Sequence, residues 1–198
     1  QRQMCIRDRY RIAVTNRHLC SIDYLSQIEK VAESGLFQAV LVREKDLTER
    51  EYTALARSVK KICTAHGIIC IYHNYAAAIK GDKDPNLQLP LSVLEGMTEK
   101  ERDRIRSRCN LFGTAVHSRE QLEQALSFGV NYVVAGHIFE TDCKKGVPPR
   151  GIPFLKSILS ASNVPVYGIG GINETNEAQV MEAGAAGVCL MSQAMTLL

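Results

Sequence analysis

The sequence predicts an α/β fold, a compact single-domain (β/α)8 TIM barrel, and three observations support this prediction. Short apolar runs alternate with amphipathic stretches eight times along the 198 residues. The apolar runs lack an inside–outside alternation, as expected for parallel strands that are buried on both faces. No GxGxxG pattern opens the first helix, which disfavours a dinucleotide-binding open sheet. Eight units therefore favour a closed barrel.

The first half of the chain supplies four of the eight units. Glycine ends the first helix at Gly35, and Thr48 with Glu51 forms a capping-box pattern at the start of the second. A charged helix over 98–108, "TEKERDRIRSR", mixes both signs and is typical of a solvated helix face. The predicted strands are 11–16, 37–44, 68–74 and 87–90, and the predicted long helices are 23–35 and 47–67.

The second half repeats the pattern, with Ser118 as a cap for the helix that follows it. The predicted strands are 112–118, 132–139, 164–172 and 187–193, and the helices are 119–129, 152–160 and 174–184. The first nine residues, "QRQMCIRDR", have no periodicity and resemble translated sequencing-adaptor read-through. We therefore expect a non-native segment at 1–9 and a barrel domain at 10–198, with a truncated eighth helix.

Composition excludes several classes of function. The net charge is +3 and no basic stripe is present, so we expect no nucleic-acid partner. No apolar run approaches the roughly 20 residues that cross a bilayer, and no convincing signal peptide is present. Seven cysteines occur without a CxxC pair, which favours reduced thiols over zinc or disulfides. We expect a cytoplasmic protein with no membrane partner.

Polar residues at the carboxyl ends of the strands are the first candidates for function, because barrel active sites lie there. His137 follows the sixth strand in "GHIFETDCKKG", whereas His18 and His66 are expected at the surface. The residues alone leave His137 open between a loop-bonding and a proton-transferring role. The candidates at strand ends are Asn16, Arg43, Lys45, His73, Asn74, His117, His137, Gly170, Gly171 and Ser192.

The last two strands end in "GIGGIN" and "LMSQ". Glycines let backbone N–H groups approach an anion, and a following helix N-terminus favours negative charge. Loops after strands seven and eight form the usual phosphate site of these barrels, although a glycine pair also fits a tight turn alone. We expect a phosphate at Gly170, Gly171, Met191 and Ser192.

Five segments together resemble the thiamine phosphate synthase superfamily, in order from about Tyr10 to the C-terminus: "LVREKDL", "GTAVHS", "GHIFETDCKKG", "VYGIGGI" and "AGAAGVCLMSQA". Within it, "GHIFETDCKKG" is most similar to the thiazole tautomerase (TenI-like) branch. The family's synthases usually carry Gly-Pro-(Ile/Val)-Phe there. They join a thiazole phosphate to a pyrimidine diphosphate that is held through magnesium.

The resemblance implies that the thiazole-phosphate half of the site is kept and the pyrimidine half is eroded. A family Asn-Asp pair is replaced by His73-Asn74, and "QLPLSVL" lacks a second aspartate. Magnesium usually requires such carboxylates beside the phosphates, so we expect no metal. The substrate-binding residues that the resemblance implies are Arg43, Lys45, Thr141, Asp142, Cys143 and Lys144.

The resemblance further implies an isomerase without a cofactor: a thiazole tautomerase that aromatises a carboxythiazole phosphate in thiamine biosynthesis. His137 would be its catalytic acid and base. His73 and His117 also face the mouth of the barrel, and either is a lesser candidate for a second proton carrier. Two alternatives stay open, a magnesium-dependent thiamine phosphate synthase and a non-catalytic regulator that binds a phospholigand. The expected partner is a small-molecule thiazole phosphate, and a homo-oligomer is left open.

Overall fold

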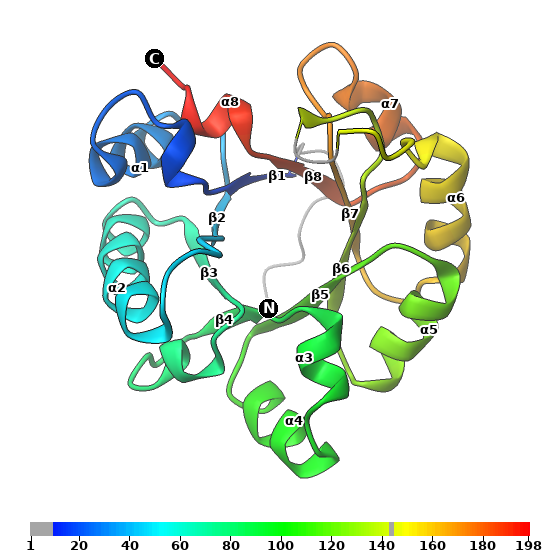
Figure 1. The fold of residues 1–198 in the computed structure, drawn as a ribbon, viewed down its shortest axis with the longest axis horizontal. Helices are drawn as coiled ribbons and strands as arrows, with labels where there is room; N and C mark the ends of the chain where they lie inside the picture. Colours follow the sequence, from blue (N-terminus) through cyan, green and yellow to red (C-terminus); the bar gives the residue numbers. More distant parts are fainter. Residues whose placement is uncertain (1–9, 143–144) are drawn as a thin grey trace.

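The computed structural model describes residues 10–142 and 145–198, and it confirms the predicted (β/α)8 barrel (Figure 1). Eight parallel strands close into a ring in sequence order, with β1 paired to both β2 and β8. The strands are β1 Tyr10–Val14, β2 Ala39–Val42, β3 Ile69–His73, β4 Asn86–Gln88, β5 Leu111–Val116, β6 Tyr132–Gly136, β7 Val166–Ile169 and β8 Gly187–Leu190.

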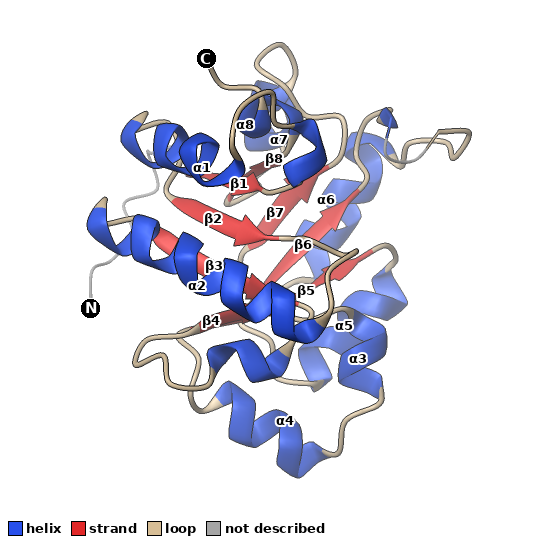
Figure 2. Cartoon of the chain, turned by 60° about the vertical axis from the view of Figure 1, so that its left-hand side comes forward, coloured by secondary structure: helices blue, strands red, loops and turns tan. Residues whose placement is uncertain are grey.

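The helices surround this ring of strands, and Figure 2 shows α1 and α2 lying along its outer face. Two helices, α3 and α4, both follow β4. The α-helices are α1 Tyr24–Glu33, α2 Glu49–Ala65, α3 Leu91–Glu95, α4 Glu99–Arg106, α5 Arg119–Ser127, α6 Gly151–Ala161, α7 Glu177–Glu182 and α8 Ser192–Met195, and the 3-10 helices are η1 Arg17–Leu19 and η2 Ala76–Ile79.

Two hydrophobic layers hold the barrel together. The outer layer packs the helices onto the strands, and its largest fully buried rings are those of Tyr52 in α2, Tyr72 in β3 and Phe112 in β5. The inner layer fills the barrel, where the Tyr132 and Tyr167 rings meet edge to face at 6.0 Å. Gly113 makes room for this layer, because a Cβ there would lie 2.3 Å from the Tyr132 ring. The interior is thus a packed core rather than a pore.

Local signals in the sequence set several helix ends. Thr48 accepts the Glu51 N–H while the Glu51 carboxylate accepts the Thr48 N–H, which confirms the predicted capping box. Ser118 caps α5 by accepting the N–H of Gln121. The helix predicted from residue 174 instead begins at Glu177. It starts late because the Asn173 side chain accepts the backbone N–H of Thr175 and holds a turn there.

Two sequence predictions concern the ends of the chain. Residues 1–9, predicted to be non-native, lie outside the described residues. The last helix, α8, spans Ser192–Met195, and Gln27 of α1 donates to the Ala194 carbonyl at 3.0 Å. Within residues 10–142 and 145–198, no helix is long and apolar enough to span a membrane.

Candidate functional site

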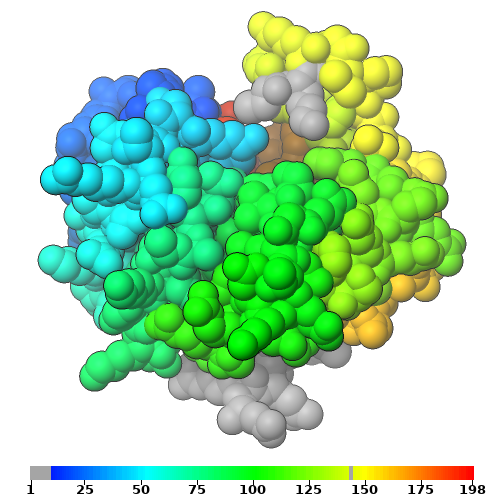
Figure 3. Space-filling view, turned by 60° about the horizontal axis from the view of Figure 1, so that its bottom comes forward, coloured from blue at the N-terminus to red at the C-terminus, as the bar shows by residue number. Residues whose placement is uncertain are grey.

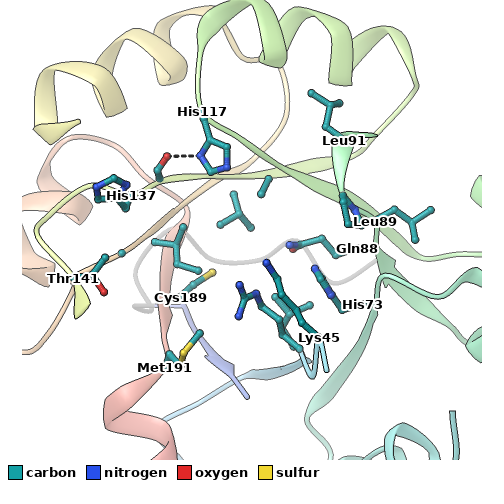
Figure 4. Close-up of a pocket in the computed structure, with 18 of the residues that line it drawn as sticks. Lys45, His73, Gln88, Leu89, Leu91, His117, His137, Thr141, Cys189 and Met191 are labelled. Carbon is teal, nitrogen blue, oxygen red and sulfur yellow. Dashed lines mark hydrogen bonds between the residues drawn. The ribbon is translucent and has the colours of Figure 1, made fainter. Parts of the chain in front are cut away.

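A cavity of about 520 Å³ opens at the carboxyl ends of the strands (Figure 4). The surface is hollowed between the cyan segment after β2 and the yellow-green segments. Deeper atoms from the last third of the chain are visible there in brown (Figure 3). The apolar floor of the cavity comes from Leu41, Ala115, Val134, Ile169 and Cys189. Its polar lining includes Arg43, Lys45, His73, Gln88, Ser92, Glu95, His117, Gln121, His137, Thr141, Gly170, Gly171 and Ser192.

The cavity has two separate polar sides. Arg43, Lys45 and His73 come from the neighbouring ends of β2 and β3. The second side comes from the ends of β7 and β8 and consists of Gly170, Gly171, Met191 and Ser192. In the ring of strands, β1 separates the two sides in one direction and β4 to β6 in the other. One side of the cavity is thus basic, and the other is rich in glycine.

His73 is held firmly in the first side. It is 7% exposed, and its backbone N–H donates to the Tyr52 hydroxyl, which in turn donates to the Val42 carbonyl at 2.8 Å. Burial, followed by the nearby Arg43 and Lys45 cations, lowers the pKa of His73 to about 3. The His73 ring is therefore neutral near pH 7 and can donate one N–H.

His137 follows the last residue of β6 and is 5% exposed. Its Nε2 lies 3.2 Å from the carbonyl oxygen of Val147 in the loop between β6 and α6. A carbonyl can only accept a hydrogen bond, so Nε2 carries the proton and Nδ1 is the basic nitrogen of the neutral ring. The loop-bonding role that the residues alone left open for His137 is thus present in the structure.

His117 follows β5 and has the opposite arrangement. Its Nδ1 lies 2.6 Å from the Gly136 carbonyl, so Nδ1 carries the proton in the neutral ring (Figure 4). The backbone N–H of His117 donates to Gln121 at 2.7 Å, which fixes the start of the loop. His117 and His137 therefore line one wall of the cavity with different ring nitrogens protonated.

The glycine pair after β7 packs against the loop that begins at His137. Gly170 and Gly171 have φ of +99° and +64°, where side chains are strained. A Cβ on Gly170 would lie 2.3 Å from the His137 Cβ, and one on Gly171 would lie 2.1 Å from the Glu140 carbonyl oxygen. This close packing requires glycine at both positions, whether or not a phosphate binds there.

Of the residues predicted to bind substrate in the loop after β6, the structure places some at the cavity and others away from it. Thr141 lines the cavity. Asp142 does not, because its side chain is 95% exposed and lies 3.5 Å from the Lys145 ammonium. Cys143 and Lys144, both predicted to bind substrate, lie outside the described residues.

Sequence reasoning missed four polar residues of the described lining: Gln88, Ser92, Glu95 and Gln121. Gln88 is the last residue of β4, so the search for polar residues at the carboxyl ends of strands could have found it. Its side chain accepts a hydrogen bond from the Tyr132 hydroxyl at 3.2 Å. Ser92 and Glu95 lie in α3 and Gln121 lies in α5, so none of them stands at the end of a strand.

The residues at the cavity do not fit the magnesium ion that the resemblance associates with synthases. Glu95 is the one carboxylate among the described lining residues. Nearby, Glu44 is buried and its oxygens accept hydrogen bonds from Thr15 and Arg17. The Glu29, Glu33 and His66 cluster does bring three ligand atoms within 4.8 Å, but His66 precedes β3, at the amino end of the barrel. Magnesium prefers several oxygen ligands, which the described lining does not gather.

Fold and site together define a (β/α)8-barrel protein with a basic small-molecule pocket at the carboxyl ends of its strands. The chain belongs to the family described as thiamine monophosphate synthase, whose model matches residues 11–194. The predicted superfamily is thereby confirmed.

Named relatives agree with this family. The chain is 30% identical over 192 residues to thiamine-phosphate synthase 2 of Streptococcus pneumoniae, covering 92% of this chain and 85% of the relative. It is 32% identical over 184 residues to the thiamine-phosphate synthase of Roseiflexus castenholzii, covering 90% and 78%. A solved thiamine phosphate pyrophosphorylase from Pyrococcus furiosus superposes with a TM-score of 0.78, at 23% identity over 94% of this chain and 87% of that one, and supports the fold.

These names correct one sequence prediction. The relatives are named as synthases, which are transferases, so the predicted isomerase class is wrong. The prediction gave most weight to one short segment, "GHIFETDCKKG", whereas the similarity to synthases extends over nine tenths of the chain. A place in thiamine biosynthesis is common to both assignments and stands.

Proposed function

We propose that this protein joins a thiazole phosphate to a pyrimidine diphosphate, as a thiamine-phosphate synthase. The observation that carries the proposal is the single cavity with two polar sides, one basic and one rich in glycine. The synthase names of the relatives support the same reaction. Two phosphorylated substrates need two anion-binding sides and a shared apolar floor, and the basic side, the glycine-rich side and the apolar floor of this cavity support that assignment.

Each side has one substrate in this proposal. The thiazole phosphate tail lies at Gly170, Gly171, Met191 and Ser192, where the backbone can come close to the phosphate. The diphosphate lies at Arg43 and Lys45, whose charges offset its own. The rings meet over the apolar floor of Leu41, Val134 and Cys189, with Thr141 at the rim.

The reaction forms one bond and breaks one. The thiazole nitrogen bonds to the methylene carbon of the pyrimidine, while the bond between that carbon and the diphosphate oxygen breaks. The electron pair leaves with the oxygen, so pyrophosphate is released and no proton transfer is required. Arg43 and Lys45 stabilise the charge that develops on the leaving diphosphate, and the cavity aligns the two reacting atoms.

The experiment mixes the purified chain with thiazole phosphate and pyrimidine diphosphate, with magnesium or with EDTA, and measures thiamine phosphate and pyrophosphate. We expect both products in equal amounts. Arg43→Ala should lower kcat/KM by roughly 10- to 100-fold, the cost of one hydrogen-bonded charge. Arg50→Ala is the matched control, because Arg50 is an exposed arginine of α2 outside the cavity.

One result would overturn the proposal. Protein that binds thiazole phosphate but forms no thiamine phosphate, with or without magnesium, would not be a synthase. That outcome would leave phospholigand binding as the property of the cavity.

A further inference from the structure

The absence of a fitting magnesium site among the described lining residues raises the question of what holds a diphosphate here. We propose that Arg43, Lys45 and His73 form a metal-independent subsite for pyrophosphate-like anions, in which the His73 ring supplies a hydrogen bond from the position next to the two cations. The inference rests on the proposed function for the identity of its natural ligand, a diphosphate ester. The arrangement of the three side chains is a property of the cavity and does not depend on the proposed function.

The register of β2 and β3 brings the three side chains together. Val42 of β2 pairs with Tyr72 of β3, so Arg43 and His73 are the next residues along two adjacent parallel strands. Lys45 lies two positions beyond Arg43, and all three side chains line the cavity. In Figure 4 the Lys45 side chain and the His73 ring lie beside one another. Two cations and one ring donor therefore face the same part of the cavity.

Hydrogen bonds hold the backbone beneath these three side chains. Tyr52 bonds both the backbone N–H of His73 and the Val42 carbonyl, so it ties the ends of the two strands together. The N–H of Arg43 donates to the Thr15 hydroxyl at 2.9 Å. The N–H after His73, that of Asn74, donates to the Gln88 carbonyl at 3.1 Å. The backbone beneath the three side chains is thus fixed before any ligand arrives, which lowers the cost of ordering a site.

The three side chains differ in charge and in the hydrogen bonds that they can donate. Arginine and lysine are permanent cations at neutral pH, and a guanidinium can donate two parallel hydrogen bonds to a phosphate. A buried neutral imidazole adds a donor without adding a third positive charge. A diphosphate offers several acceptor oxygens on adjacent phosphorus atoms, so it can use all three groups together. Orthophosphate, with a single phosphorus, should use fewer of them.

The test is calorimetric titration of the full chain with inorganic pyrophosphate in EDTA, beside titration with orthophosphate. We expect saturable pyrophosphate binding without metal, and weaker orthophosphate binding. His73→Leu should weaken pyrophosphate binding roughly tenfold, the value of one hydrogen bond to a charged group. His73→Gln keeps a neutral donor and should restore most of the affinity. Lys61→Ala, an exposed lysine of α2, is the control for net charge.

Pyrophosphate binding that appears only when magnesium is added would overturn the inference. So would equal affinities for wild type, His73→Leu and His73→Gln, each checked by thermal unfolding to be folded. Failure of the proposed function is a different result. Pyrophosphate binding in EDTA without formation of thiamine phosphate would leave the subsite in place and remove only the synthase.

Discussion

The hydroxyl of Thr15, just after β1, donates a hydrogen bond to Oε1 of Glu44 at 2.7 Å. The same oxygen of Thr15 accepts the backbone N–H of Arg43 at 2.9 Å. Glu44 is 3% exposed and also accepts the backbone N–H of Arg17 at 3.1 Å. This network fixes the residue that lies between Arg43 and Lys45, so the two cations point into the cavity on either side of an anchored carboxylate.

Thr15→Val should test this network. The change keeps the shape of the buried side chain but leaves the Glu44 carboxylate and the Arg43 N–H each short of one partner. We expect the free energy of unfolding to fall by about 2 kcal/mol in urea titrations. Pyrophosphate affinity should fall as well, because Arg43 is no longer held. Thr64→Val, in an exposed turn of α2, is the matched control, and an equal effect of both changes would contradict the interpretation.

Gly171→Ala and Gly35→Ala should differ sharply although both glycines have a positive φ, +64° and +69°. A Cβ on Gly35 meets nothing within 4 Å, so alanine there costs only the backbone strain, about 1 kcal/mol. At Gly171 the Cβ collides with the Glu140 carbonyl, and the total loss should reach about 3 kcal/mol. Chemical denaturation of both variants gives the comparison. Similar losses would show that the loop after β6 moves aside freely.

The depressed pKa of His73 predicts a stability that depends on pH. In the unfolded chain a histidine titrates near 6.5, whereas in the folded protein His73 titrates at about 3. Between these values the unfolded state binds more protons, so the free energy of unfolding falls as pH is lowered from 6.5 towards 3. Between pH 7 and pH 5 the wild type should lose about 2 kcal/mol more than His73→Gln. Equal losses for the two proteins would show that the pKa of His73 in the folded protein is not lowered.

Glu177→Ala should be far more damaging than Glu123→Ala. Glu177 of α7 is 2% exposed and binds Arg11 of β1 through two hydrogen bonds, at 2.6 and 3.0 Å. Its removal leaves a mostly buried guanidinium without this carboxylate, and we expect a loss of about 3 kcal/mol. The pair of Glu123 with Arg119 is more than half exposed and should contribute less than about 0.5 kcal/mol. Thermal unfolding that ranks the two variants the other way would refute this account.

The fold could be predicted because its signals are local. The capping box of Thr48 and Glu51 and the cap at Ser118 depend on residues within one turn, and both are present as predicted. The strand predicted over 87–90 is observed as Asn86–Gln88, so it begins one residue earlier and ends two residues earlier than predicted. Leu89 and Pro90 leave the sheet, since Pro90 has no N–H to donate to the ladder and instead precedes α3.

The site was less predictable, because it depends on how loops and helices meet after the barrel closes. The position of Arg43, Lys45 and His73 at the carboxyl ends of strands predicted that they lie together, and all three line the cavity. It could not reveal that the Asp142 side chain points outward or that Glu95 of α3 reaches the cavity. The direction of a loop side chain is set by partners distant in the sequence, and no local pattern records it.

The packed interior beneath the cavity has a consequence for any reaction there. Through the described part of the barrel, Ile12, Val14, Tyr132 and Tyr167 fill the space below the floor. Every molecule that enters must leave by the opening through which it came. Under the proposed function, the two products therefore leave through the opening by which the next two substrates arrive. Either product that stays behind should act as an inhibitor, because it occupies a side of the cavity that an incoming substrate needs.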